Sequence, residues 1–120
     1  MRMKEKVVLI TGATGEIGTE MTRRFLTEGA SVFITGRSAE KLADMVQSMG
    51  VGARLKTCLV DALDESAVSF SVERCVAEFG GIDAIIANAG TEGKVQPLEK
   101  YSVEEFNETL LVNVTGVWLY

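Results

Sequence analysis

The sequence contains no histidine and only two cysteines, and these two do not form a Cys-x-x-C pair. The common zinc motifs and redox dithiols are therefore absent, and we expect no metal site. Cys58 falls in a short apolar run and Cys75 in a helix-like stretch. We expect both to be buried, reduced thiols, because free cysteine behaves as a small apolar residue.

Basic clusters and long apolar runs are also missing. The net charge is −5, and lysine and arginine are not gathered in a block. This disfavours nucleic acid as a main partner, because neutralising phosphates needs a clustered basic face. Only four strongly apolar residues follow Lys6 before Thr11, too few for a signal peptide or a membrane span. We therefore expect a cytoplasmic protein that binds neither nucleic acid nor a membrane.

What the sequence does contain is a regular alternation of apolar runs and helix-like stretches. The runs begin at Val7, Ser31, Leu55 and Ile82, at intervals of 24, 24 and 27 residues. Short, nearly continuous apolar runs are typical of strands buried on both faces of a parallel sheet. The pattern predicts an α/β fold with a doubly wound parallel sheet. The predicted strands are residues 7–10, 31–35, 55–60 and 82–87.

The predicted helices between these strands have recognisable ends. Gly29 and Gly50 stand where the first two should stop, and Asp64 is the expected N-cap of the third. Ser102 and Glu105 form a capping box for the last helix. The faces expected to pack on the sheet are Ile17, Met21, Phe25 and Leu26 in the first helix, Leu42, Met45, Val46 and Met49 in the second, and Val68, Val72, Cys75, Val76 and Phe79 in the third.

A glycine-rich turn links the first predicted strand to the first predicted helix. It reads Thr-Gly-Ala-Thr-Gly-Glu-Ile-Gly from Thr11 to Gly18. Such a turn suits a pyrophosphate, because the first N–H groups of a helix are unpaired and lie at its positive end. Glycine also lets the phosphates approach the backbone. The spacing is neither G-x-G-x-x-G nor a P-loop, and a tight turn that requires positive φ is the alternative interpretation.

Four motifs, in order, resemble those of the short-chain dehydrogenase/reductase family. Its members carry a T-G-x-x-x-G-x-G turn, an aspartate after the third strand, an N-A-G after the fourth and an asparagine in the next helix. Here these read Thr11–Gly18, Asp61, Asn88-Ala89-Gly90 and Asn113, and the resemblance covers all 120 residues. It implies a Rossmann-type sheet of about four strands in the order 3-2-1-4. It also implies hydride transfer between a nicotinamide cofactor and a small carbonyl or alcohol substrate.

Two positions depart from the family pattern. Glu16 stands where the middle glycine is commonest, and Gly15 precedes it. The resulting T-G-x-x-G-x-x-G spacing is more usual in the epimerase-like branch. A carboxylate beside a pyrophosphate is unfavourable unless it points into solvent. Ala87 replaces a second asparagine that the family often has, and we expect this change to loosen only a local contact.

The end of the second predicted strand bears on the choice of cofactor. An acidic residue there binds the ribose 2′-OH of NAD, but this sequence has Gly36-Arg37. A guanidinium can hold a 2′-phosphate bidentately, which favours NADP(H) and leaves NAD(H) possible. The alternative is that Arg37 lies on a solvated helix start. The resemblance places Asp61 at the adenine amino group and Ala62 at the ring edge, with a strand-end hydrogen bond as the alternative for Asp61. The expected cofactor-binding residues are Gly12, Thr14, Gly15, Glu16, Ile17, Gly18, Arg37, Asp61, Ala62, Asn88, Ala89 and Gly90.

The expected catalytic residues are almost all missing. By resemblance, Asn113 takes part in the proton relay, and its amide must find partners if it is buried. The loop Thr91–Pro97 follows the fourth strand, so it either contacts nicotinamide or substrate or is a simple surface connection. The family's proton donor is a tyrosine followed four residues later by lysine. Only Tyr101 and Tyr120 occur here, and neither has that lysine. We interpret Tyr101 as an ordinary loop aromatic.

We therefore expect residues 1–120 to form one dinucleotide-binding unit that is incomplete at its C-terminus and inactive alone. The leading hypothesis is the cofactor-binding half of an NADP-preferring short-chain oxidoreductase that assembles as a homo-oligomer. One alternative is a non-catalytic nucleotide-binding module of the same fold. Another is the front half of an epimerase- or dehydratase-like relative, which the glycine spacing suggests.

Overall fold

A computed structural model describes residues 1–120, and it contains one sheet of four parallel strands. The strand order is β3-β2-β1-β4, which confirms the predicted α/β fold and the order 3-2-1-4. The strand bounds are β1 Val7–Ile10, β2 Ser31–Gly36, β3 Leu55–Leu59 and β4 Ala84–Ile86.

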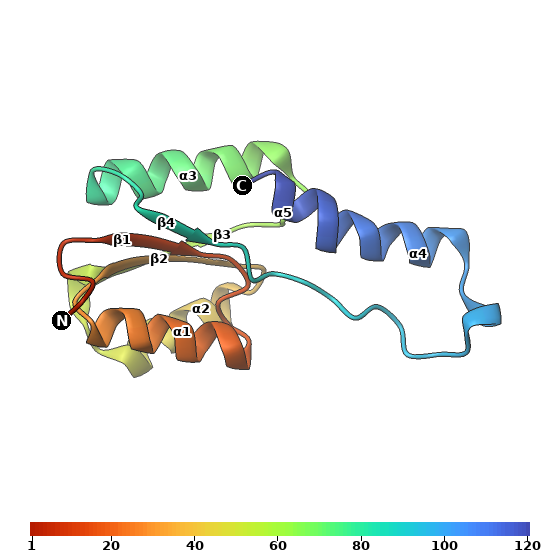
Figure 1. Ribbon diagram of the computed structural model, residues 1–120, viewed down its shortest axis with the longest axis horizontal. Coiled ribbons are helices and arrows are strands. Elements are labelled where there is room, and N and C mark those ends of the chain that lie inside the picture. Colours follow the sequence, from red (N-terminus) through yellow and green to blue (C-terminus); the bar gives the residue numbers. More distant parts are fainter.

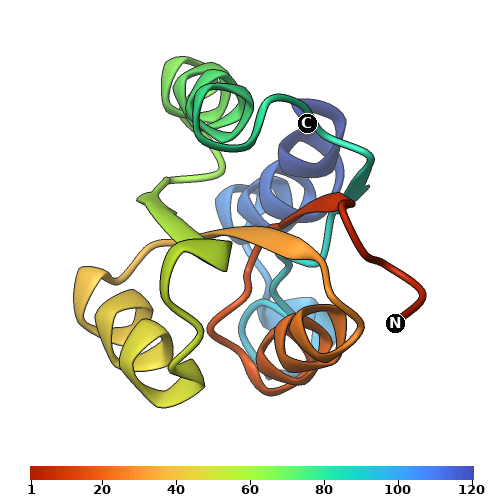
Figure 2. The same cartoon turned by 90° about the vertical axis from the view of Figure 1, so that its left-hand side faces the viewer.

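Helices cover both faces of this sheet. On one face lie α1 (Glu16–Thr27) and α2 (Ala39–Met49), and on the other lies α3 (Glu65–Phe79) (Figures 1 and 2). The last helical segment runs from α4 (Val103–Leu110) through a π-helical turn, η3 (Leu111–Thr115), into α5 (Gly116–Trp118). Short 3₁₀ turns occur at η1 (Gly52–Arg54) and η2 (Leu98–Lys100). None of the helices is both long enough and apolar enough to span a membrane.

The two faces of the sheet have separate cores. Because successive strand residues point to opposite faces, Val8 and Ile10 pack toward α1 and α2, whereas Val7 and Leu9 pack toward α3. Cys75 is buried in the α3 core, and this burial raises the pKa of its thiol to about 11. Cys58 is buried there too, and both thiols are unpaired, as the sequence predicts.

The expected helix ends are present. Gly50 closes α2 in the left-handed conformation, and Gly29 follows α1 with φ +92°. The Asp64 carboxylate accepts the backbone N–H of Ala67 at 3.1 Å. Ser102 and Glu105 make both hydrogen bonds of the capping box. These ends depend on local contacts only, which is why the sequence pattern predicts them correctly.

The packing face of α1 matches the prediction at Met21, Phe25 and Leu26 but not at Ile17. Its buried residues are Gly18, Thr22 and Leu26, whereas Ile17 is 70% exposed. A Cβ at Gly18 would lie 2.6 Å from the Ala13 Cα, so α1 begins in contact with the backbone of the preceding turn. A residue without a side chain is therefore required in the first turn of α1. In α3, four of the five expected residues pack into the core, but Val76 is exposed and the polar Ser71 is buried.

Strand β4 is shorter than the predicted run of residues 82–87. At its start, the Asp83 carboxylate accepts the backbone N–H of Val7 at 2.8 Å, and the Asp83 N–H donates to the Val7 carbonyl at 2.9 Å. At its end, the Asn88 N–H donates to the carbonyl of Ile86 at 2.9 Å, which turns the chain out of the sheet. Polar side chains and a tight turn thus limit the strand to three residues.

Beyond β4 the chain leaves the compact part of the molecule. The segment after Ala87 and helix α4 extend past the carboxyl ends of the strands (Figure 1), and the molecule measures 49 × 26 × 26 Å. This extension faces the same edge of the sheet as the glycine-rich turn. It therefore supplies one end of the cleft described next.

Candidate functional site

A cleft of about 1250 Å³ lies along the carboxyl ends of the strands. In open α/β sheets this edge is where ligands bind. All twelve residues expected to bind the cofactor line it, and their individual roles stay predictions. They are Gly12, Thr14, Gly15, Glu16, Ile17, Gly18, Arg37, Asp61, Ala62, Asn88, Ala89 and Gly90.

The three glycines of the turn are required for different reasons. Gly12 has φ +59°, and a Cβ there would lie 2.7 Å from the Cα of Ala89. A Cβ at Gly18 would lie 2.6 Å from the Cα of Ala13. Contacts within the protein therefore require glycine at both Gly12 and Gly18. At Gly15, in contrast, the nearest atom to an added Cβ is the Gly12 carbonyl oxygen at 3.7 Å. Gly15 therefore borders open space in the cleft.

The start of α1 points into this open space. Gly15 is its N-cap and has an extended conformation, and no side chain caps the helix. The first N–H groups of α1 are thus left for a ligand or solvent. Unpaired N–H groups at the positive end of a helix suit a diphosphate. The residues present therefore fit a dinucleotide.

Glu16 is the first residue of α1, and its side chain is exposed to solvent. This is the condition under which a carboxylate next to a pyrophosphate is tolerated, since water screens the repulsion. The unusual glycine spacing is thus compatible with a phosphate site.

Asn88 and Ala89 hold the glycine-rich turn in place. The side-chain Nδ2 of Asn88 donates to the carbonyl of Gly12 at 3.1 Å, and the backbone N–H of Ala89 donates to the Thr11 Oγ1 at 3.0 Å. No buried side-chain nitrogen or oxygen lacks a partner. These two residues therefore support the site through its backbone, a task that sequence reasoning did not assign to them.

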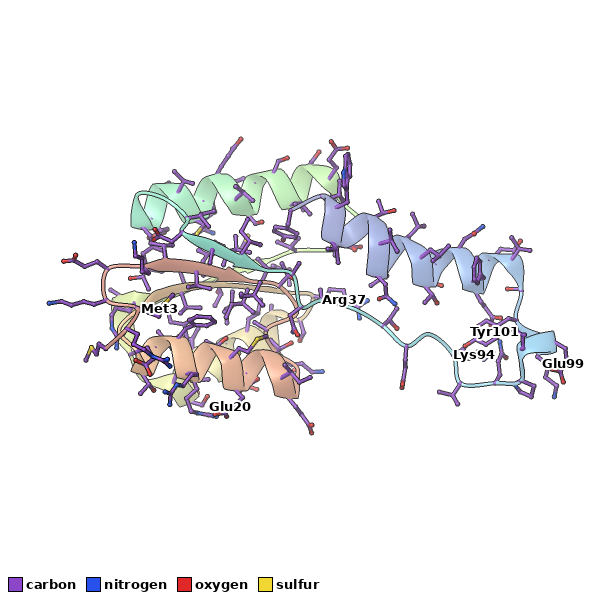
Figure 3. The ribbon with its side chains drawn as sticks, viewed as in Figure 1. Met3, Glu20, Arg37, Lys94, Glu99 and Tyr101 are labelled. Atoms are coloured by element: carbon purple, nitrogen blue, oxygen red, sulfur yellow. The ribbon has the colours of Figure 1, made fainter.

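The end of β2 places two cations in the cleft. Arg37 is exposed at the edge of the sheet and forms no ion pair (Figure 3). Lys41 also lines the cleft. It lies in the first turn of α2, where the Ser38 Oγ accepts its backbone N–H at 3.3 Å. Sequence reasoning missed Lys41. Lys41 could have been predicted, because it lies in the first turn of a helix that starts beside Arg37.

Asp61 follows the end of β3 and faces the cleft. Its Oδ1 accepts the backbone N–H of Leu63 at 3.0 Å, so the strand-end hydrogen bond is present. The other carboxylate oxygen has no protein partner, which leaves it for a ligand. The contact with adenine stays a prediction.

Asn113 lies outside the cleft lining, at the centre of η3. It is exposed, yet its side-chain amide still has hydrogen-bond partners in the protein. Its Oδ1 accepts the N–H of Thr91 and its Nδ2 donates to the carbonyl of Thr91, both at 2.7 Å. The amide thus fastens the segment after Gly90 to the last helix. Its relay role stays a prediction.

The far end of the cleft is formed by the extension. Thr91, Gly93 and Lys94 contribute from the segment after β4, and Figure 3 shows Lys94 on this extension. Polar residues of α4 also line this end. Of the loop Thr91–Pro97, which the sequence offered as a ligand contact or a surface connection, only these three residues line the cleft. Tyr101 does not line the cleft, whereas Tyr120 does. The lining residues that sequence reasoning missed here are Glu105, Glu108, Thr109, Val112 and Tyr120.

Comparisons with known proteins agree with this arrangement. The family model described as short chain dehydrogenase matches residues 6–120. Levodione reductase of Leifsonia aquatica is 34% identical over 98% of this chain and 45% of its own length. An NADP-dependent 3-hydroxy acid dehydrogenase of Shigella flexneri is 32% identical over 92% of this chain and 44% of its own length.

Solved structures of the same kind superpose closely. A short-chain dehydrogenase/reductase of Brucella melitensis matches 99% of this chain and 50% of its own, with a TM-score of 0.94 and 27% identity. A 3-ketoacyl-(acyl-carrier-protein) reductase of Brucella melitensis, complexed with NADH, matches 98% of this chain and 48% of its own, with a TM-score of 0.90 and 34% identity. The chain thus spans about half the length of the relatives that it matches.

Proposed function

This chain belongs to the short-chain dehydrogenase family, and on that premise we propose that it binds NADP(H) for hydride transfer to or from a small carbonyl or alcohol substrate. The observation that carries the proposal is the open space at Gly15, next to the uncapped start of α1. When bound, the reduced cofactor would supply the hydride and the oxidised cofactor would accept it. The chain's own residues bind and orient it, with the glycine-rich turn at the diphosphate.

A substitution at Gly15 tests this proposal directly. Gly15 has φ −73°, which any residue adopts, and an added Cβ meets no close neighbour. Gly15→Val should therefore keep the fold while its side chain fills the cradle. We expect the fluorescence titration with NADPH to show at least about a hundredfold loss of affinity, because several charge-assisted hydrogen bonds to the phosphates are blocked.

Gly81→Val is the matched control, since a Cβ at Gly81 also meets nothing within 4 Å and this residue lies outside the cleft. Its NADPH affinity should stay at the wild-type level. Equal NADPH binding by the wild type and Gly15→Val would contradict the proposed site.

The proposed preference for NADP(H) rests on Arg37 and Lys41. Both cations line the same end of the cleft, where no carboxylate ends β2. A 2′-phosphate placed there gains a guanidinium and an ammonium, whereas a 2′-hydroxyl gains neither charge interaction. NAD(H) lacks this phosphate, so we expect it to bind more weakly.

For catalysis we propose that Asn113 contributes to the proton relay and that the proton donor lies elsewhere in the whole protein. Tyr-x-x-x-Lys does not occur in residues 1–120. We therefore expect residues 1–120 alone to bind cofactor without turning over substrate. A whole protein that also lacks this motif and shows no reductase activity would favour the alternative, a non-catalytic nucleotide-binding module.

We also propose that the whole protein is a homo-oligomer, with α4 in its interface. The outer side of the last helix carries exposed apolar residues at intervals of three and four. This spacing is typical of a helix that packs along another helix, and an exposed apolar patch of this kind indicates a protein contact. The residues are Val103, Phe106, Leu110, Val114 and Val117.

A further inference from the structure

The segment between β4 and α4 is fastened to the last helix at two points, one at each side of Gly93. We name residues Thr91–Tyr101 the strap. At the first point, the Asn113 amide makes its two hydrogen bonds of 2.7 Å with the backbone of Thr91. At the second, the Glu105 carboxylate accepts the side-chain Nε2 of Gln96 at 2.9 Å. The strap is thus held along one face of the helix.

Between these points the strap packs against Thr109. Gly93 has φ +73°, and a Cβ there would lie 2.7 Å from the Thr109 Oγ1. Glu105, Thr109 and Asn113 are spaced by four residues, so they share one face of a helix. The helix therefore turns a polar stripe toward the strap, while its apolar residues face outward.

Glu105 is the centre of the second attachment. Its Oε2 accepts the backbone N–H of Ser102 at 3.0 Å as well as the Gln96 amide, and its Oε1 lies 3.5 Å from the Lys94 ammonium. These contacts, the Ser102 N–H first, lower the pKa of the Glu105 carboxyl. One carboxylate thus caps α4 and holds two residues of the strap.

Little else holds this part of the strap. Val95 and Leu98 are each 85% exposed, and the only side-chain hydrogen bonds from residues 94–100 to the rest of the chain end on Glu105. Loss of the Glu105 contacts would therefore release the strap between Gly93 and Tyr101.

The strap forms the wall of the cleft at the end opposite Arg37. Its Gly93 and Lys94 line the cleft together with Glu105 and Thr109 of α4. If the glycine-rich turn holds the diphosphate, as proposed above, this end beyond Gly90 is left for the substrate. We infer that Glu105 is a positioning residue, which shapes the substrate-binding end of the cleft by fastening the strap to α4. This inference depends on the proposed function only for the identity of the ligand.

Trypsin cleavage after Lys94 and Lys100 measures release of the strap in the whole protein without any ligand. When opening and closing are fast, the cleavage rate follows the population of the open form. Gln96→Ala and Glu105→Ala should each raise the rate about tenfold, the effect of losing one or two hydrogen bonds. The double variant should be no faster than Glu105→Ala, because both changes remove the same contact.

Ser102→Ala is the matched control. It removes the hydrogen bond from the Glu105 N–H to the Ser102 Oγ and keeps both the Ser102 N–H and the strap contacts. Its cleavage rate should stay within about twofold of the wild type, since only the cap is weakened. Glu105→Gln should be intermediate, because its amide oxygen still accepts one N–H. Equal acceleration by Ser102→Ala and Gln96→Ala, or none by either, would overturn the role of the strap contacts.

The effect on the cleft is measured in the whole protein with Gln96→Ala. NADPH affinity should change by less than about twofold, because the glycine-rich turn is unaffected, while KM for a carbonyl substrate rises about tenfold and kcat is nearly constant. An unchanged KM would contradict the positioning role. Failure of the wild type to bind NADPH would refute the proposed function instead, and the trypsin experiment would still decide whether Glu105 fastens the strap.

Discussion

Asn88 donates a hydrogen bond from its side-chain amide to the backbone carbonyl of Gly12, at 3.1 Å and across 76 residues of sequence. The contact joins the end of β4 to the glycine-rich turn after β1. Two motifs that look independent in the sequence therefore form one structural unit. The neighbouring contact from the Ala89 N–H to the Thr11 Oγ1 strengthens the same junction.

Removal of this contact should weaken both the fold and the site. Asn88→Ala leaves the Gly12 carbonyl without its amide partner, so we expect a loss of about 1 kcal/mol in the free energy of unfolding. NADPH affinity should fall about tenfold, because the turn is less well ordered. Urea unfolding and NADPH titration measure the two effects. Asn107→Ala, an exposed change in α4, should alter neither.

Arg37 should determine the choice of cofactor. In the whole protein, NADPH should bind more tightly than NADH by about 1.5–3 kcal/mol, as expected for hydrogen bonds to a charged group. Arg37→Ala should remove most of that difference, and Gly36→Asp should shift the preference toward NADH. Calorimetric titrations with both cofactors provide the measurement. Arg23→Ala, an exposed arginine outside the cleft, serves as the control, and equal wild-type affinities would refute the preference.

Asp83 should make stability depend on pH. The Val7 N–H, followed by the nearby Lys6 ammonium, lowers the pKa of the Asp83 carboxyl below its ordinary value of 3.8. A depressed folded-state pKa stabilises the fold above pH 3.8, and this contribution is lost as the pH falls through the lower folded value. The urea midpoint of Asp83→Asn should therefore lie below that of the wild type at pH 7.

The same difference between Asp83→Asn and the wild type should shrink as the pH falls below 3.8, because the Asp83 carboxylate is then progressively protonated in the folded protein. Asp44→Asn, an exposed change in α2, is the control variant. Parallel urea midpoints for Asp83→Asn and wild type from pH 7 to pH 3 would show that the Asp83 charge is unimportant.

The apolar side of α4 should mediate self-association. Phe106→Glu places a charge among exposed apolar residues, and burying an unpaired charge in an interface is costly. Sedimentation velocity of the whole protein should therefore shift toward the monomer for this variant. Asn107→Glu adds the same charge one residue away from the apolar series and should leave the assembly intact. If the wild type is a monomer at micromolar concentration, the proposed self-association is wrong.

The sequence by itself determined the order of the elements, the helix ends and the residues that line one half of the cleft. Apolar runs, cap residues and the glycine-rich turn act through neighbours in the chain. A parallel sheet then brings the carboxyl ends of its strands to one edge whatever the details of packing. For this reason the strand pattern, together with the resemblance to the short-chain dehydrogenase/reductase family, predicts that Gly15, Arg37 and Asp61 line the cleft.

Only the tertiary structure decided the remaining features, because each depends on a contact between distant segments. Gly18 rather than Ile17 faces the sheet because the backbone of Ala13 lies against it. Asn113 finds its partner in Thr91, 22 residues away, and Glu105 joins a predicted helix cap to a strap that carries no regular pattern. Sequence periodicity reports which side of an element is apolar, but it does not report which polar groups will meet across the space between elements.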